Sequence, residues 1–193
     1  SHSLPPEGRK QMAGVASKTR CLNELLEAVS TYARVAKQPM ERQRVDTAAL
    51  VSEVLQQLTS EHDGRCVEIR VGDLPECEGD PTLLRMAFTH LLTNAFKFTR
   101  TRDVAIIDIQ CRRTGNEIIW SVRDNGIGFR KDQIHRLFVP FQRLHRTQGY
   151  DGAGVGLATV QRIAGRHDGR AWAECHDPGA TFYFALPAPA PRN

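Results

Sequence analysis

Two glycine-rich turns constrain this chain more than any other feature. One spans 124–128 (DNGIG) and follows an alternating apolar pattern, and the other spans 152–157 (GAGVGL) and runs into a helical apolar pattern. Glycine tolerates positive φ and lets backbone amides approach a ligand closely. A glycine turn that opens a helix also leaves first-turn N–H groups unpaired, where the helix dipole favours anions. The pair predicts a phosphate-bearing ligand beneath a lid formed by the segment between the turns.

The length and composition fit one ordinary domain with an appended element. Of 193 residues, 40% are hydrophobic and 25% charged, which is enough to bury a core, and the net charge of +4 is mild. No block of lysine and arginine is long enough to predict a nucleic-acid partner. The five scattered cysteines form no C-x-x-C pair, which favours free thiols over disulfides or a zinc site.

The chain shows neither a membrane span nor a signal peptide. No apolar run approaches the ~18 residues that a spanning helix needs, and no charged and apolar leader opens the sequence. We therefore expect a cytoplasmic piece without direct membrane contact, whose parent protein could still be membrane-anchored.

A long amphipathic helix is predicted near the N-terminus, from Arg9 to about Lys37. Its apolar residues alternate at spacings of three and four, as in a heptad seam: Met12, Val15, Thr19, Leu22, Leu26, Val29 and Ala33. Such a helix needs a partner in water. That partner is either another helix, in a hairpin or dimer, or the domain that follows. Pro39 ends the helix and predicts a linker or hinge over 38–45.

The rest of the sequence predicts an α/β fold. Asp46 is typical of a helix N-cap, and Pro81 of a first helical position after Asp80. The expected helices are 47–59, 81–98 and 157–167, and the expected strands are 66–71, 104–111, 117–123, 170–175 and 180–186. Residues 114–116 form a hairpin turn between two of these strands. This order predicts a two-layer sandwich, with a mixed sheet covered by helices on one face.

Three polar side chains share one face of the 81–98 helix. His90, Asn94 and Lys97 are separated by four and three residues, so they project from the same side. A carboxamide oxygen suits Mg²⁺ and a lysine neutralises phosphate. Asp124, at the end of a strand, can accept a hydrogen bond from an exocyclic amine such as that of adenine. There is no Walker motif and no protein-kinase catalytic loop, so a nucleotide site here must be of another type.

Four segments together resemble the sequence boxes of the sensor histidine kinases. The N box is similar to 90–99 (HLLTNAFKFT), the G1 box to 124–128, the F box to 137–143 (LFVPFQR) and the G2 box to 152–157. Their order and spacing follow the family over about residues 46–187. The stretch 158–184 most resembles kinases with PAS or phytochrome-type sensor modules.

The resemblance implies the Bergerat ATP-binding fold, shared with gyrase, Hsp90 and MutL, with ATP and Mg²⁺ as cofactors. By position, Asp124 would bind the adenine amino group, Asn94 would hold Mg²⁺, and Lys97 would meet the phosphates. Arg143 would be the lid arginine that reaches the γ-phosphate. The remaining implied binding residues are the lid hinges Gly126 and Gly128 and the phosphate turn Gly152, Gly154, Gly156 and Leu157. Phe138 and Phe141 are expected to pack the lid onto the domain.

The N-terminal helix resembles the second helix of the family's dimerisation and phosphotransfer hairpin. This implies a division into a partial hairpin (1–40), a catalytic ATP-binding domain (41–187) and a loose tail (188–193). The first hairpin helix, with the phosphoacceptor histidine, is expected to be missing, because Pro5, Pro6 and Gly8 would break a helix directly after His2. The implied partners are a phosphoacceptor helix in cis or trans, the receiver domain of a response regulator, and a second copy in a full-length homodimer.

His90 departs from the family pattern, which usually has asparagine there and glutamate in the hydrolysing relatives. Its imidazole could hydrogen-bond the water shell of Mg²⁺, could act as a weak base, or could be a conservative polar replacement. The predicted function is transfer of the ATP γ-phosphoryl group to a histidine. The alternatives are a stand-alone gyrase/Hsp90-like ATPase and a non-catalytic nucleotide-binding scaffold.

Overall fold

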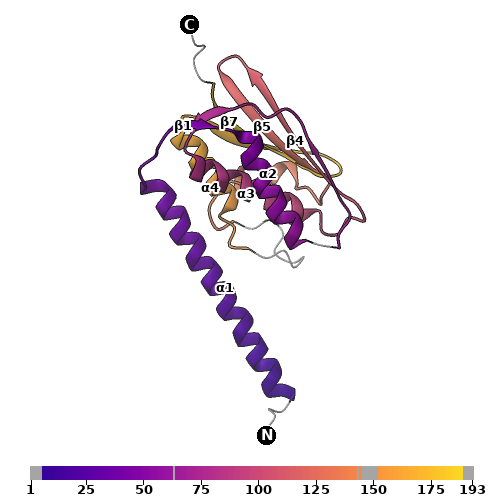
Figure 1. Ribbon diagram of the computed structural model, residues 1–193. Coiled ribbons are helices and arrows are strands. Elements are labelled where there is room, and N and C mark those ends of the chain that lie inside the picture. The colour runs from indigo at the N-terminus through magenta and orange to yellow at the C-terminus, as the bar shows by residue number, and fades with distance from the viewer. Residues whose placement is uncertain (1–5, 63, 143, 145–151, 189–193) are drawn as a thin grey trace.

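The computed structural model describes residues 6–62, 64–142, 144 and 152–188. Figure 1 shows a long helix followed by an α/β domain. The helices are α1 (Pro6–Lys37), α2 (Thr47–Glu61), α3 (Pro81–Phe98), the 3-10 helix η1 (Lys131–Arg136) and α4 (Gly156–Arg166). The strands are β1 (Gln43–Val45), β2 (Val67–Val71), β3 (Cys77–Gly79), β4 (Ala105–Thr114), β5 (Glu117–Asp124), β6 (Arg170–Cys175) and β7 (Ala180–Pro187).

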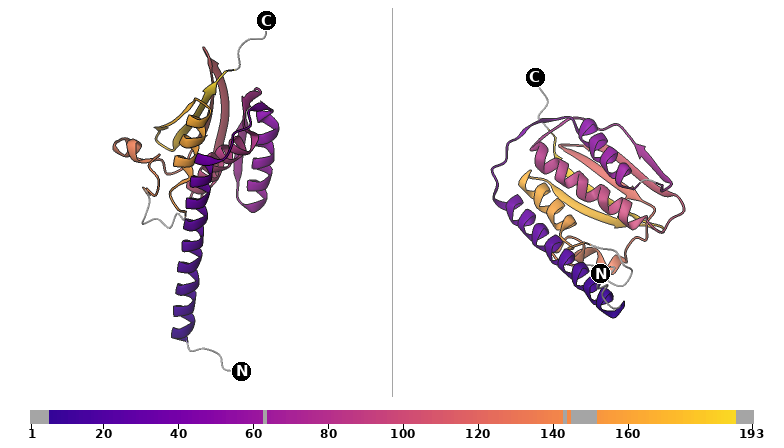
Figure 2. Two further views of the ribbon diagram at one scale, coloured as in Figure 1. Left: turned by 90° about the vertical axis from the view of Figure 1, so that its left-hand side faces the viewer. Right: turned by 60° about the horizontal axis from the view of Figure 1, so that its bottom comes forward.

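Within the described residues, the main sheet has five strands in the order β2-β4-β5-β7-β6. The β2–β4 pair is parallel and the other pairs are antiparallel, so the sheet is mixed. Helices α2, α3 and α4 cover one face of this sheet (Figure 2). The predicted two-layer α/β sandwich is therefore confirmed.

The α2 and α3 helices begin where the sequence predicts. The Asp46 carboxylate accepts a hydrogen bond from Ala49 N at 2.9 Å, and Asp80 accepts from Thr82 N and Leu83 N, each at 3.0 Å. One side of α3 is buried against the aromatic core, where Phe88 meets Trp120 and Phe184 edge-on. This packing fixes the rotation of α3 and leaves the face with His90, Asn94 and Lys97 at the border of the core.

The linker after α1 contains a strand that the sequence pattern does not predict. Residues Gln43–Val45 pair antiparallel with Cys77–Gly79, and Val45 is paired with Cys77. The Glu41 amide donates to the Asp80 carboxylate at 3.1 Å, which ties the linker to the start of α3. Three-residue strands are too short to show a period of two, so only the tertiary contact reveals them.

The long projecting part of α1 and its C-terminal end have different surroundings. Met12, Val15, Leu22 and Leu26 are between 60 and 65% exposed, and this part of the helix projects away from the domain (Figures 1 and 2). No helix in the described residues is apolar and long enough to cross a membrane.

The C-terminal end of α1 packs against α4. Val35 is fully buried, and Arg162 donates to the Tyr32 hydroxyl at 2.8 Å while its guanidinium lies over the tyrosine ring. Arg166 donates to the carbonyls of Val35 and Gln38, each at 2.7 Å. Packing on the following domain therefore accounts for this end of the helix, and the predicted seam remains exposed from Met12 to Leu26.

Candidate functional site

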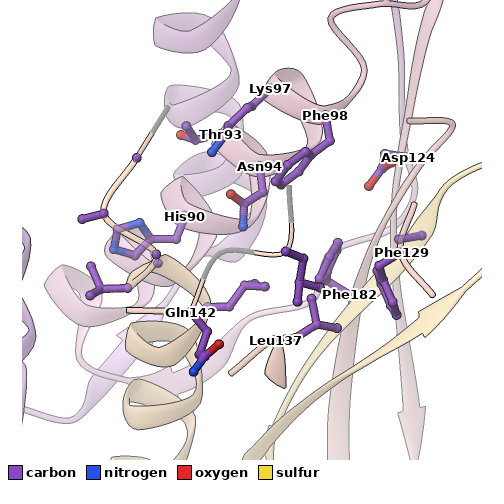
Figure 3. Close-up of a pocket in the computed structure, with 18 of the residues that line it drawn as sticks. His90, Thr93, Asn94, Lys97, Phe98, Asp124, Phe129, Leu137, Gln142 and Phe182 are labelled. Atoms are coloured by element: carbon purple, nitrogen blue, oxygen red, sulfur yellow. The ribbon is translucent and has the colours of Figure 1, made fainter. Parts of the chain in front are cut away.

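A cavity of about 360 Å³ lies between α3, the end of β5, the start of α4 and β7. Figure 3 shows Asn94 between His90 and Asp124 along this cavity. Nine of the predicted site residues line it: His90, Asn94, Lys97, Asp124, Gly128, Gly152, Gly154, Gly156 and Leu157. The fold thus brings together groups that are up to 67 positions apart in the sequence.

Asp124 provides a buried hydrogen-bond acceptor in the wall of the cavity. Its side chain sits where β5 ends, and the residue is 3% exposed. Burial raises the pKa of this carboxyl to about 6. The backbone N–H groups of Gly126 and Ala180 and the positive charge of Arg102 act in the opposite direction and lower the pKa. The carboxylate is therefore ionised above about pH 6 and can accept a hydrogen bond from a ligand.

The polar face of α3 lines the cavity next to the second glycine turn. A Cβ on Gly152 would lie 3.3 Å from Lys97 Nζ, and a Cβ on Gly156 would lie 3.3 Å from His90 Nδ1. The lysine and the imidazole are therefore each within side-chain contact of this turn. A larger residue at either glycine would push into the polar face of α3.

His90 is held as a neutral imidazole. Burial lowers its pKa, and its buried Nε2 has no hydrogen-bond partner among the described residues. An unpartnered buried ring nitrogen at a cavity wall is a group that a ligand or a water molecule can satisfy.

The start of α4 borders the cavity. Val155, Gly156 and Leu157 all line it, and no side chain in the described residues caps this helix end. Gly154 has a φ of +72°, a conformation that other residues adopt only with strain. Uncapped first-turn amides behind a glycine turn form an anion site.

Of the predicted site residues that the structure describes, only Gly126 is not in the wall of the cavity. Gly126 is buried behind Asp124, where a Cβ would lie 2.6 Å from the Phe98 carbonyl oxygen. Arg143 lies outside the described residues, and so does most of the predicted lid, since 145–151 are also outside them.

The two phenylalanines that were expected to pack the lid onto the domain, Phe138 and Phe141, differ in their packing. Phe138 packs against the core as expected. The expectation is wrong for Phe141, which is 47% exposed and has a φ of +63°. Its amide instead donates to the Gly154 carbonyl at 2.9 Å, so this backbone bond, rather than the ring, joins the segment to the second turn.

Sequence reasoning missed several residues of the cavity wall. Glu24 and Ala28 come from α1, Phe129 directly follows the first turn, and Phe182 comes from β7. Nothing in the local pattern distinguishes these residues from core or surface positions. Thr93 lies inside the N box and Gln142 inside the F box, so these motifs were a usable signal for both residues.

The donor set determines how a cation could be held here. No cluster of three or more histidine, cysteine, aspartate or glutamate side chains in the described residues could hold a metal ion. A lone carboxamide from Asn94 fits Mg²⁺ only if the ligand's own phosphates and water supply the other oxygens, which is how Mg²⁺ commonly binds with nucleotides. The cavity therefore fits a metal that arrives with a nucleotide.

Comparison with known proteins agrees with this geometry. Residues 79–190 match the family model described as "Histidine kinase-, DNA gyrase B-, and HSP90-like ATPase". The phytochrome-like protein Cph1 of Synechocystis is 34% identical over 97% of this chain and 25% of its own length. The adaptive-response sensory kinase SasA of Synechococcus elongatus is 31% identical over 96% of this chain and 47% of its own length. The chain thus spans between a quarter and about half of these curated relatives.

Solved structures share the fold over almost the whole chain. Full-length ShkA in complex with AMPPNP is 26% identical, with a TM-score of 0.73 over 99% of this chain and 41% of that one. Histidine kinase ThkA in complex with the response regulator TrrA is 19% identical, with a TM-score of 0.70 over 97% of this chain and 53% of that one. With the family model matching most of the chain, this protein belongs to the histidine kinase-, DNA gyrase B- and HSP90-like ATPase family.

Proposed function

We propose that this chain is the ATP-binding catalytic part of a sensor histidine kinase, which transfers the γ-phosphoryl group of ATP to a histidine nitrogen. The observation that carries the proposal is the cavity itself. It places a buried carboxylate, a lysine and an uncapped helix start around one space of nucleotide size. The relatives named as phytochrome-like protein and sensory kinase support the kinase assignment.

At the base end, Asp124 accepts a hydrogen bond from the exocyclic amine of adenine. Its carboxylate is ionised above about pH 6, so both oxygens are acceptors at neutral pH. Guanine does not present an amine at the same place, and the buried acceptor would be left unpaired beside it. The site therefore binds adenine in preference to other bases.

At the phosphate end, charge neutralisation is shared between Lys97 and the start of α4. The ammonium group lies near Gly152, and the amides behind Gly154 and Gly156 face the same space. Asn94 would hold Mg²⁺, which would offset the charge on the phosphates. By resemblance, Arg143 adds a second positive charge at the γ-phosphate. His90 enters as a neutral group that can receive a hydrogen bond from a metal-bound water molecule.

The partners follow from the reaction. A phosphoacceptor helix, in cis or in trans, presents its histidine to the cavity, and the phosphoryl group then passes to an aspartate of a response-regulator receiver domain. Residues 1–40 form part of the dimerisation and phosphotransfer hairpin, 41–187 the catalytic domain and 188–193 the tail. In the full-length protein the hairpin forms a homodimer in the cytoplasm, where ATP is supplied.

The substitution Asp124→Asn tests the nucleotide site. It removes the negative charge without changing the side-chain volume, and we expect ATP affinity to fall by roughly a hundredfold, because a hydrogen bond to a charged group is lost and a donor is left unpaired. Calorimetric titration measures the affinity, and circular dichroism checks the fold. If Asp124→Asn binds ATP as tightly as the unsubstituted chain does, the site is assigned wrongly.

A transfer assay separates the kinase from the two alternatives. The chain is incubated with γ-labelled ATP and a phosphoacceptor hairpin helix supplied in trans. We expect acid-labile, base-stable label on the helix, the signature of a phosphohistidine. Steady release of phosphate without labelled protein supports a stand-alone ATPase. Binding without label or release supports a scaffold.

A further inference from the structure

Arg102 is an arginine outside the cavity wall that connects two loops. It lies between α3 and β4, and its Nη2 donates to the Gly126 carbonyl oxygen at 2.8 Å. Its own amide donates to the Thr99 carbonyl at 2.9 Å, which fixes the base of the side chain. None of the sequence boxes includes this residue. Its guanidinium nevertheless reaches the middle of the first glycine turn.

Both polar backbone groups of Gly126 are used. Its N–H donates to Asp124 Oδ1 at 2.8 Å, and its carbonyl accepts from Arg102. A Cβ at this position would lie 2.7 Å from the same Oδ1. The orientation of Gly126 therefore controls a hydrogen bond to the carboxylate of Asp124. Arg102 holds the carbonyl group of the same glycine.

The rest of the turn is fixed to neighbouring elements by different bonds. The Asn125 side chain accepts from Ile106 N at 2.9 Å and donates to the Val104 carbonyl at 3.0 Å. The Ile127 amide donates to the Phe98 carbonyl at 3.2 Å. These bonds keep the turn in place if Arg102 is changed, so substitution of the arginine tests its own contribution rather than the fold.

The charge of Arg102 acts on Asp124 as well. The pKa of this carboxyl is raised by burial, and the nearby guanidinium lowers it together with the two backbone N–H groups. Among the described residues, the other charged or titratable groups around it are Glu24, Lys97 and His90, which line the same cavity, and three side chains on the far side of the sheet. Those three, Arg70, Asp108 and Arg123, line a second cavity of about 240 Å³ that Asp124 also borders.

We propose that Arg102 is a positioning residue for adenine recognition, which acts through Asp124 by fixing Gly126 and by placing a positive charge beside the carboxylate. This inference rests on the proposed function, because it takes Asp124 as the adenine acceptor. The guanidinium is not part of the cavity wall. Its effect is carried by the N–H of Gly126 and by its positive charge.

The test compares Arg102→Gln and Arg102→Lys with the parent chain. ADP without added metal is titrated by calorimetry between pH 5.5 and 8.5, and each variant's affinity is divided by that of the parent at the same pH. This ratio removes the titration of the ADP phosphates. Arg112→Gln is the matched control, because it removes the same charge from an exposed position farther along β4 from Ile107, the residue paired with Asp124.

We expect the Arg102→Gln ratio to depend on pH. Loss of the positive charge disfavours the ionised carboxylate. If the midpoint moves up by about one pH unit, the carboxylate is roughly a fifth as ionised at the old midpoint. ADP affinity relative to the parent should therefore fall about fivefold more at pH 6 than at pH 8.5. Arg102→Lys keeps the charge, so its affinity ratio should depend on pH much less than that of Arg102→Gln. The affinity ratio of Arg112→Gln should not depend on pH.

The possible outcomes distinguish a failure of this inference from a failure of the proposed function. Failure of the parent chain to bind ADP, or undiminished binding by Asp124→Asn, overturns the proposed function. If the parent binds ADP and Asp124→Asn does not, a pH-independent ratio for Arg102→Gln overturns only the role of Arg102. Carbon-13 NMR of the Asp124 carboxyl in the ligand-free proteins gives an independent reading. An unchanged midpoint in Arg102→Gln contradicts the inference even if that variant binds poorly.

Discussion

The two glycine turns are attached to different parts of the molecule. The first is bonded to the core: Asn125 pairs with the start of β4, and Ile127 with the end of α3. The second is joined to the surface segment of the F box through the bond from Phe141 N to Gly154 O. The proposed adenine end of the cavity is thus built into the sheet layer, whereas the proposed phosphate end belongs to α4 and the segment packed beside it.

This difference matches what each turn has to do. Recognition of a base needs one acceptor at a fixed position, so Asp124 must be held before the ligand arrives. A phosphate chain can be met by several backbone amides, which tolerate small displacements. Substitutions that affect one turn should therefore separate base recognition from phosphate binding.

The largest expected effect is the loss of folding stability caused by burial of the Asp124 carboxylate at the first turn. The pKa of Asp124 is about 6 in the folded chain, against an ordinary value of 3.8, so the folded state loses stability as pH rises from 3.8 through 6. The loss amounts to about 3 kcal/mol at pH 8. Asp124→Asn has no charge to bury and should be more stable than the parent by an amount of this order at pH 8, as measured by urea unfolding. The difference should disappear near pH 4, and a constant difference at all pH values would contradict the assignment.

The next effect comes from crowding the first turn. In Gly126→Ala the added Cβ would lie 2.6 Å from the Phe98 carbonyl, so backbone must move. We expect a cost of about 2 kcal/mol, or roughly thirtyfold in affinity, for both adenosine and ADP. Gly165→Ala, which places a Cβ in open space on α4, is the control and should leave both affinities unchanged. Loss of ADP binding with normal adenosine binding would reverse our division of the site.

The smallest effect is expected at the second turn. Gly154→Ala places a side chain at a φ of +72°, which costs about 1 kcal/mol. ADP affinity should fall roughly fivefold, and adenosine affinity should not change. Equal losses for the two ligands would mean that the turns are coupled rather than independent. Calorimetric titration of both ligands against one protein preparation provides the comparison.

Local rules predicted most of the fold. The caps at Asp46 and Asp80 depend on contacts within three residues, so they can be read from the sequence. The β1–β3 ladder depends on a pairing between Val45 and Cys77, and its strands are too short for a periodic pattern. Long-range pairs of this kind are decided by how larger elements pack, which no local window contains.

The candidate site shows the same limit. The residues of the glycine turns and of the α3 face could be predicted, because they form dense motifs. Arg102 and Glu24 could not, since each reaches the site from an element whose path is set by tertiary packing. The exposed ring of Phe141 was missed for a related reason: its backbone, not its side chain, makes the contact with Gly154.

The contact between α1 and α4 also has a mechanical consequence. Arg162 and Arg166 hold Tyr32, Val35 and Gln38 near the C-terminal end of α4, and the other end of this helix is the phosphate turn. An 11-residue helix is about 16 Å long and stiff over that length. Torque applied to α1 is therefore transmitted to a short, stiff helix whose other end lines the cavity. A sensor module fused ahead of α1 should preserve the register of α1 at these residues if its motion is to reach the proposed phosphate site.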